Sequence, residues 1–427
     1  MIALVVALMV VLLLLGFPLK VPLLVGALAL LFIELPFLEP AALIRQMISG
    51  ITPVVLSAVP LFILAADLMT RGRTSRSLLD LVSATIGHLR GGLPITTAVS
   101  CALFGAVSGS TQATVVAMGT PLRPRLLQAG YRDPFTLALI VNASDVALLI
   151  PPSIGMIVYG VVAGASVGEL FIAGIGPGLM VVTLFSVWCY VYSRWHAIPT
   201  EPRASWSQRW IALRRAALPL GFPVIVVGGI YAGLFTPTEA AAMAVLYAAS
   251  LELGVYRSLG LRDLLEVARS TGVITAVVFI LVASGQALAY TLSFAQIPQE
   301  LIGPLIGAVG HNPELALLAI AVIYFIGCMF LDPVVVILVV TPLVAPLVAA
   351  TGLDPVLVGV VVVLQAAIGS ATPPFGCDLF TAMAVFRRPY LEVIRGTPPF
   401  ILILLFATVM LVYFPQIALF LRDLAFR

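Results

Sequence analysis

The side chains best suited to chemistry in this chain are oxygen donors that interrupt long apolar runs. In chain order these positions are Ser108, Gly109, Ser110, Thr111, Asn142, Asp145, Pro151, Ser153, Gly327, Asp332, Thr372, Gly376 and Asp378. Hydroxyl, amide, carboxylate and backbone carbonyl oxygens are the ligands that hard cations prefer. The four cysteines have no close pair and no metal-ligand spacing, so we assign them no chemistry. The pattern therefore predicts sites for a hard cation.

Each of these positions also has a purely structural interpretation. Small residues such as those at 108–111 let two membrane helices pack closely. Asp332 precedes Pro333 and is a candidate helix cap. Asp145 and Asp378 are suited to binding a proton, sodium or a substrate ammonium, and equally to pairing with an arginine at a domain edge. The sequence leaves that choice open.

The interruptions occur twice, in the same order. Thr120-Pro121, Asp133-Pro134 and Pro151-Pro152 recur as Thr341-Pro342, Asp354-Pro355 and Pro373-Pro374, at offsets of 221, 221 and 222 residues. In each copy we expect a hairpin whose tip is polar, followed by a helix that the double proline breaks. The tips are 108–111 and 330–333, and the breaks are 150–153 and 371–374. A repeat of this kind in an apolar chain is typical of secondary transporters.

Composition places these elements in a membrane. Of the 427 residues, 61% are apolar and only 10% are charged, far fewer charges than a soluble domain carries. The apolar runs predict roughly ten to thirteen membrane-embedded helical pieces. A broken helix survives at membrane depth only where it lines a cavity enclosed by protein. A net charge of +3 excludes an electrostatic case for nucleic-acid binding, and short arginine-rich connections at 71–76, 203–215 and 257–269 are expected in the cytoplasm.

We therefore expect an all-α polytopic membrane protein with two structural repeats. The expected parts are N-terminal scaffold helices (1–90), a first transport-domain half (91–192), a connecting loop (193–215), second-half scaffold helices (216–295) and a second transport-domain half (296–427). We expect the repeats to be inverted, although a helix count from sequence leaves the parity open.

Several multi-residue motifs resemble a known family, the large membrane subunit of tripartite ATP-independent periplasmic (TRAP) transporters. The matching segments are Gly16-Phe17-Pro18, Phe104 to Ser110, Leu149 to Ile154, Tyr159 to Gly164, Leu170 to Gly178, Thr236 to Ala241 and Gly369 to Gly376. The resemblance covers essentially the whole chain. The chain departs from the family pattern at the apolar stretch 146–150 and at Cys328-Met329 and Cys377-Asp378. These differences put the identity of the substrate in doubt more than the mode of transport.

The resemblance implies a multi-pass protein of the bacterial inner membrane and an elevator mechanism driven by sodium, with no enzymatic activity and no other cofactor. It implies three partners besides membrane lipid: a small four-helix membrane subunit, a soluble periplasmic substrate-binding protein and an organic-acid substrate. On this interpretation sodium binds at the first tip with Asn142 and the Pro151 break, and at the second tip with the Thr372 break. The metal-site candidates are Ser108, Gly109, Ser110, Asn142, Pro151, Ser153, Gly327, Asp332, Thr372 and Gly376. The substrate-site candidates are Ser110, Thr111, Asn142, Asp145, Ser153, Thr372 and Asp378.

Three other functions stay open at this point. A stand-alone ion-coupled carboxylate carrier would need no delivery protein. An intramembrane enzyme would need a nucleophile with a base or a pair of aspartates at helical spacing, and neither pattern is evident. A passive channel would show no saturable exchange.

Overall fold

The computed structural model describes residues 2–310 and 312–426, and in these ranges the regular structure is entirely helical. The first half contains α1 Ile2–Leu14, α2 Lys20–Ile33, α3 Pro40–Ile51, η1 Val54–Ser57, α4 Ala58–Arg71, α5 Thr74–Ile86, α6 Gly92–Ser108, α7 Thr111–Gln128, α8 Asp133–Ser144, η2 Asp145–Leu148, α9 Ile154–Ala163 and α10 Val167–Trp195. The second half contains α11 Trp206–Pro223, η3 Val224–Gly228, α12 Gly229–Tyr231, α13 Pro237–Ala249, η4 Ser250–Val255, α14 Leu261–Phe294, α15 Ile297–Val309, α16 Pro313–Phe330, α17 Pro333–Thr351, α18 Pro355–Ser370, α19 Cys377–Phe386, α20 Tyr390–Ile394, α21 Pro398–Tyr413 and α22 Gln416–Ala425.

Among the described residues, seven helical segments are long and apolar enough to cross a membrane, or eight if the bent pair α21 and α22 forms one span. The long spans are fewer than the expected number of embedded pieces because the remaining apolar helices, such as α6, α9, α18 and α19, have only 10–17 residues. Short helices are what a hairpin and a broken span require. The apolar segment formed by α21 and α22 is bent by 57°. The bend lies at Pro415, whose ring cannot continue a straight helix.

The polar connection between the halves is shorter than the sequence suggests. α10 continues to Trp195, and α11 begins at Trp206. The Ser205 side chain accepts a hydrogen bond from the Gln208 amide while the Gln208 side chain accepts one from the Ser205 amide, so a capping box starts α11. Most of the arginines between 203 and 215 therefore lie on a helix.

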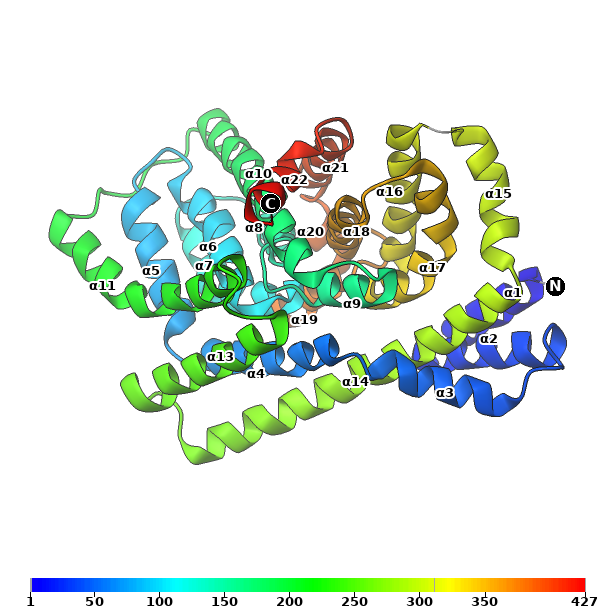
Figure 1. Ribbon diagram of the computed structural model, residues 1–427. Helices are drawn as coiled ribbons and strands as arrows, with labels where there is room; N and C mark the ends of the chain where they lie inside the picture. The colour runs from blue at the N-terminus through cyan, green and yellow to red at the C-terminus, as the bar shows by residue number, and fades with distance from the viewer. Residues whose placement is uncertain (1, 311, 427) are drawn as a thin grey trace.

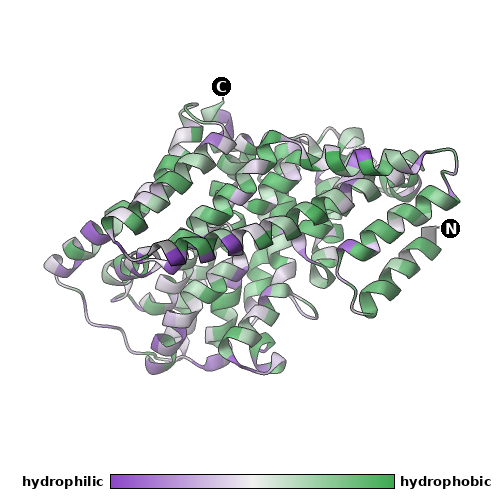
Figure 2. Ribbon diagram, turned by 90° about the horizontal axis from the view of Figure 1, so that it is seen from below, coloured by the Kyte–Doolittle hydropathy of each residue, from purple (hydrophilic) through white to green (hydrophobic). Residues whose placement is uncertain are grey.

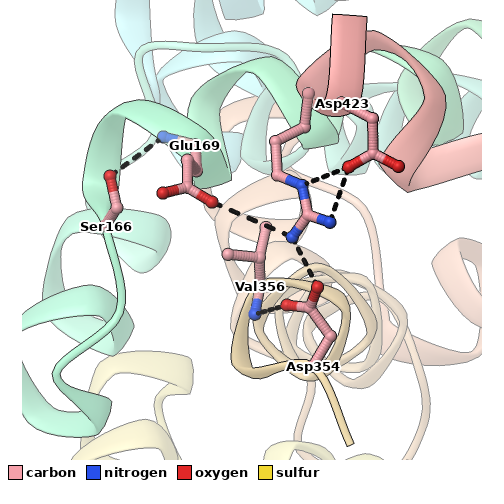
Figure 3. A network of polar contacts seen from close by, with 6 residues as sticks. Ser166, Glu169, Asp354, Val356 and Asp423 are labelled. Carbon is pink, nitrogen blue, oxygen red and sulfur yellow. Dashed lines mark hydrogen bonds and ion pairs between the residues drawn. The ribbon is translucent and has the colours of Figure 1, made fainter. Parts of the chain in front are cut away.

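The hairpins α6–α7 and α16–α17 have their bases at opposite ends of α10. At the C-terminal end of α10, the Ser193 hydroxyl lies 2.8 Å from the hydroxyl of Tyr131, which follows α7. At the N-terminal end, Arg422 joins Glu169 of α10, at 3.8 Å, to Asp354, which follows α17 (Figure 3). The two hairpins therefore enter the molecule from opposite ends of α10, which is the arrangement that an inverted repeat requires.

The helices form two groups that meet along α14. In Figure 1, α3, α4, α13 and α14 run along the lower side, while the hairpins and broken helices lie above them. α14 packs against α2, α3 and α4 and also against α17 of the second hairpin. Figure 2 shows apolar residues along most helices and hydrophilic residues gathered toward helix ends and connections. α14 is therefore the long element on which the second hairpin rests.

Candidate functional site

The first hairpin turns at the residues expected from the sequence. α6 ends at Ser108, Gly109 adopts a left-handed φ of +61°, and Ser110 caps α7 by accepting a hydrogen bond from the Ala113 amide at 3.4 Å. The Thr114 hydroxyl donates to the Ser110 carbonyl at 2.8 Å. The small polar residues therefore close the turn between two closely packed helices, which is the structural role considered from the sequence. Their oxygens lie at the tip of the hairpin.

This tip packs directly on the first helix break. A Cβ on Gly109 would collide with the carbonyl oxygen of Pro152, so only glycine allows the two backbones to approach this closely. Past the break, the buried Ser153 side chain caps α9 by accepting from the Met156 amide at 3.4 Å. Both Pro151-Pro152 and Pro373-Pro374 are joined by cis peptides.

The second hairpin repeats the arrangement. Asp332 caps α17 by accepting from the Val334 amide at 2.9 Å, so its structural interpretation is confirmed. The Phe375 amide, in the second break, donates to the Met329 carbonyl beside the hairpin tip at 3.2 Å. A Cβ on Gly369 would collide with Cys328. Each tip is therefore fastened to the helix break of its own half.

Between the two breaks lies a pair of fully buried carboxylates. Asp378 accepts hydrogen bonds from the Thr111 hydroxyl at 2.8 Å and the Ser370 hydroxyl at 2.9 Å. The same Ser370 hydroxyl lies 3.4 Å from Oδ1 of Asp145. No ion pair reaches either aspartate among the described residues, so the expected alternative of an arginine partner is wrong for both.

Two buried oxygens at this place have no hydrogen-bond partner in the part of the chain that the structure describes. They are Oδ2 of Asp145 and Oδ1 of Asn142, whose amide nitrogen donates to the Ala138 carbonyl at 2.8 Å. A buried polar atom without a partner costs about 1–3 kcal/mol. An ionised carboxylate at this depth also needs a counter-charge. The arrangement therefore fits a cation, and the donor set of hydroxyl, amide and carboxylate oxygens suits sodium.

The remaining candidates contribute backbone or packing contacts. The Gly327 carbonyl accepts from the amide of Leu331, the C-cap of α16, at 3.0 Å, and a Cβ on Gly327 would press on Val336. The Thr372 hydroxyl donates to the Ile368 carbonyl at 2.6 Å, and the Thr372 carbonyl accepts from the Gly376 amide at 3.2 Å. These residues hold the second break in shape.

A cavity of about 330 Å³ separates the two tips. Its polar lining includes Ser110, Thr111 and Asp332. The far wall is apolar and comes mainly from α14, with Val273, Ile274, Val277, Val278 and Leu281. Such a mostly apolar pocket with a few convergent polar groups is typical of a small-molecule site. Asp378 lies directly behind its wall, because Thr111 lines the cavity and hydrogen-bonds that carboxylate.

The chain matches the family described as "Tripartite ATP-independent periplasmic transporter, DctM component" over residues 6–417. It is 60% identical to the ectoine TRAP transporter large permease protein TeaC of Halomonas elongata over 426 residues, 99% of each chain. This chain belongs to the TRAP transporter large permease family.

Two further relatives show the range of this TRAP permease family. The ectoine/5-hydroxyectoine TRAP transporter large permease protein UehC of Ruegeria pomeroyi is 61% identical over 421 residues, 98% of each chain. The C4-dicarboxylate TRAP transporter large permease protein DctM of Pseudomonas aeruginosa is 38% identical over 365 residues, 85% of each chain. These relatives are permease subunits and not enzymes. With its spanning helices, the TRAP permease is a multi-pass protein of the bacterial inner membrane.

Solved transporters share the fold of this TRAP permease. The Alcanivorax borkumensis YdaH transporter superposes with a TM-score of 0.62 at 16% identity, covering 87% of this chain and 86% of its own. The Neisseria gonorrhoeae efflux pump MtrF superposes with a TM-score of 0.53 at 12% identity, covering 90% and 85%.

Sequence reasoning missed two parts of the site. It did not select Ser370, which links the carboxylates, although Gly369-Ser370 ends an apolar run as the other selected residues do. It also missed the α14 wall, whose residues are apolar and carry no motif. Only an amphipathic pattern around the helix would have pointed to that wall, and a membrane helix is apolar on every side.

Proposed function

We propose that this TRAP permease imports ectoine-type solutes, driven by sodium and supplied by a periplasmic binding protein, through an elevator movement of both hairpins along α14. Two relatives named for ectoine are 60% and 61% identical, whereas a C4-dicarboxylate relative is 38% identical. Ectoine is an organic acid, the substrate class that the family resemblance implies, but it also carries a delocalised amidinium cation. The substrate we propose is therefore a zwitterion and not a dicarboxylate.

The observation that carries the proposal is the cavity between the two tips. The N-terminal ends of α7 and α17 meet at it, through Ser110 and Asp332. The positive end of α7, whose cap Ser110 is uncharged, favours a substrate carboxylate. Asp332 and the Thr111–Asp378 contact provide negative charge for the amidinium end. The apolar wall of α14 accommodates the ring.

The sodium sites we propose are the two contacts between tip and break. The first uses the 108–110 tip, Asn142 and the Pro151 break, where unpartnered oxygens of Asn142 and Asp145 are buried. The second uses Asp332 and the Thr372 break. Without sodium the hairpins would carry uncompensated charge past α14, which couples substrate movement to the ion.

Sodium coupling is tested by ectoine uptake into proteoliposomes that contain both membrane subunits and receive the binding protein. Replacing external sodium with choline removes the counter-charge for the buried carboxylates, so uptake should fall to background. Unchanged uptake in choline would reject sodium coupling. Uptake without the binding protein would favour a stand-alone carrier.

The buried carboxylate is tested by Asp378→Asn. This substitution keeps the shape but removes the charge and weakens two hydrogen bonds, which should lower uptake at least about tenfold, since hydrogen bonds to charged groups contribute about 1.5–3 kcal/mol. The matched control is Asp80→Asn on the exposed surface of α5. Equal uptake by both variants at equal folded protein would contradict a role for Asp378.

A further inference from the structure

A second cavity, of about 330 Å³, lies outside the proposed transport site, between the start of α8, the end of α10 and the start of α21. Its floor is aromatic. The Phe135 and Tyr192 rings stack with centroids 3.8 Å apart, and the Phe400 ring lies 5.9 Å from that of Phe135. Two exposed arginines, Arg132 and Arg395, stand on its rim.

Neither of these two arginines has an acidic partner among the described residues. Arg123 and Arg388 both pair with Asp133, at 2.7 and 3.2 Å. Because Asp133 pairs with Arg123 and Arg388, it forms no ion pair with Arg132, its neighbour in the chain. The rim of the cavity therefore carries positive charge that the protein does not neutralise.

A third donor also lacks a partner here. Trp188 lines the cavity, and its buried indole nitrogen has no hydrogen-bond acceptor within residues 2–310 and 312–426. The cost of a buried unsatisfied donor indicates that a ligand supplies the acceptor. An anionic oxygen would serve the indole and the two guanidinium groups at once.

The position of the cavity identifies the kind of anion. It lies at the end of α10 that leads into the arginine-rich connection, and Arg388 and Arg123 gather at the same end. An excess of arginine marks the cytoplasmic side, and aromatic residues mark the level of the lipid headgroups. A phosphate with an attached acyl glycerol fits a charged rim above an aromatic floor, and basic pockets between membrane helices on this side bind anionic headgroups.

We infer that the cavity between α8, α10 and α21 binds the phosphate headgroup of an anionic phospholipid, held by Arg132, Arg395 and the Trp188 indole. The glycerol and the first acyl carbons rest on Phe135, Tyr192 and Phe400. This site is separate from the substrate cavity, and its occupancy can be measured without transport.

The test is native mass spectrometry of the purified membrane complex, washed in detergent and supplied with equal amounts of phosphatidylglycerol and phosphatidylcholine. Wild-type protein should retain phosphatidylglycerol preferentially. The variant Arg132→Gln/Arg395→Gln should retain at least threefold less, while Arg132→Lys/Arg395→Lys, which keeps both charges, should retain most of it. The matched control is Arg214→Gln, an exposed arginine on α11.

Three results would overturn the inference. One is equal retention of phosphatidylglycerol by wild type and the double glutamine variant, with both eluting as monodisperse complexes. Another is equal retention of the two lipids by wild type. The third is competition: if inorganic phosphate at millimolar concentration displaces the retained lipid completely, the site binds free phosphate and not a headgroup anchored by its acyl chains.

Discussion

At the scale of single residues, the site depends on close contacts around the hairpin tips and the helix breaks. Gly109 combines a left-handed backbone with a contact to the Pro152 carbonyl that leaves no room for a Cβ. Ser370 places one hydroxyl between two carboxylates. A change of one methyl group at such positions alters how the hairpin tip meets the helix break.

Gly109→Ala should destabilise the protein more than Gly164→Ala does. Both glycines have similar left-handed angles, φ +61° and +68°, so both substitutions carry the same backbone cost of about 1–2 kcal/mol. Only Gly109 faces a neighbouring backbone, and Gly164 has open space. The collision should cost at least about 1 kcal/mol more.

The measurement is the melting temperature of the two variants in detergent, together with ectoine uptake at equal folded protein. Gly109→Ala should melt lower and transport less. If the two variants melt alike, the hairpin tip does not pack on the break as described.

At the scale of elements, an arginine on α22 holds three helix ends together. Arg422 contacts Asp354 at the start of α18, Glu169 at the start of α10 and Asp423 on its own helix (Figure 3). The Arg422 side chain is only 15% exposed, so these contacts are less screened than surface ion pairs. The network fixes the base of the second hairpin against α10.

Arg422→Gln should lower the free energy of unfolding by about 1–2 kcal/mol, between the values for surface and buried pairs. The matched control is Arg45→Gln, whose 3.8 Å pair with Glu39 is exposed at both side chains, by 75% and 80%. That control should change stability by less than about 0.5 kcal/mol. Denaturation of both variants in the same detergent is the measurement, and equal losses would mean that the network contributes no more than an exposed pair.

At the scale of the whole molecule, the proposed elevator requires the second hairpin to slide along α14. A Cβ built on Gly285 of α14 lies 2.8 Å from the Leu338 Cβ of α17. Cysteines at these two positions could form a disulfide after a shift of about 1 Å, since bridged Cβ atoms lie about 3.8 Å apart.

Gly285→Cys/Leu338→Cys should therefore lose uptake on oxidation and recover it on reduction, because the bond would lock the hairpin to α14. Each single cysteine variant is a control and should be unaffected by the oxidant. Full uptake by the oxidised and demonstrably cross-linked protein would show that the two helices need not move against each other.

The sequence by itself determined the features that act over a few residues. Apolar runs determined membrane residence, proline pairs determined the breaks at 151 and 373, and Ser110 and Asp332 marked where α7 and α17 begin. These follow from hydropathy, ring geometry and capping, which depend on local chain chemistry. The sequence predicts a connecting loop over 193–215, whereas α11 begins at Trp206, because a helix that starts with several polar residues resembles a loop in composition.

Only the tertiary structure decided which of these features meet. Ser370 and Asp145 are 225 residues apart, and Thr111 and Asp378 are 267 apart, yet they share one buried cluster. The apolar face of α14 closes the cavity opposite them. Such contacts depend on the direction in which each hairpin enters and on how helices pack, and neither is encoded in the residues near the contact itself.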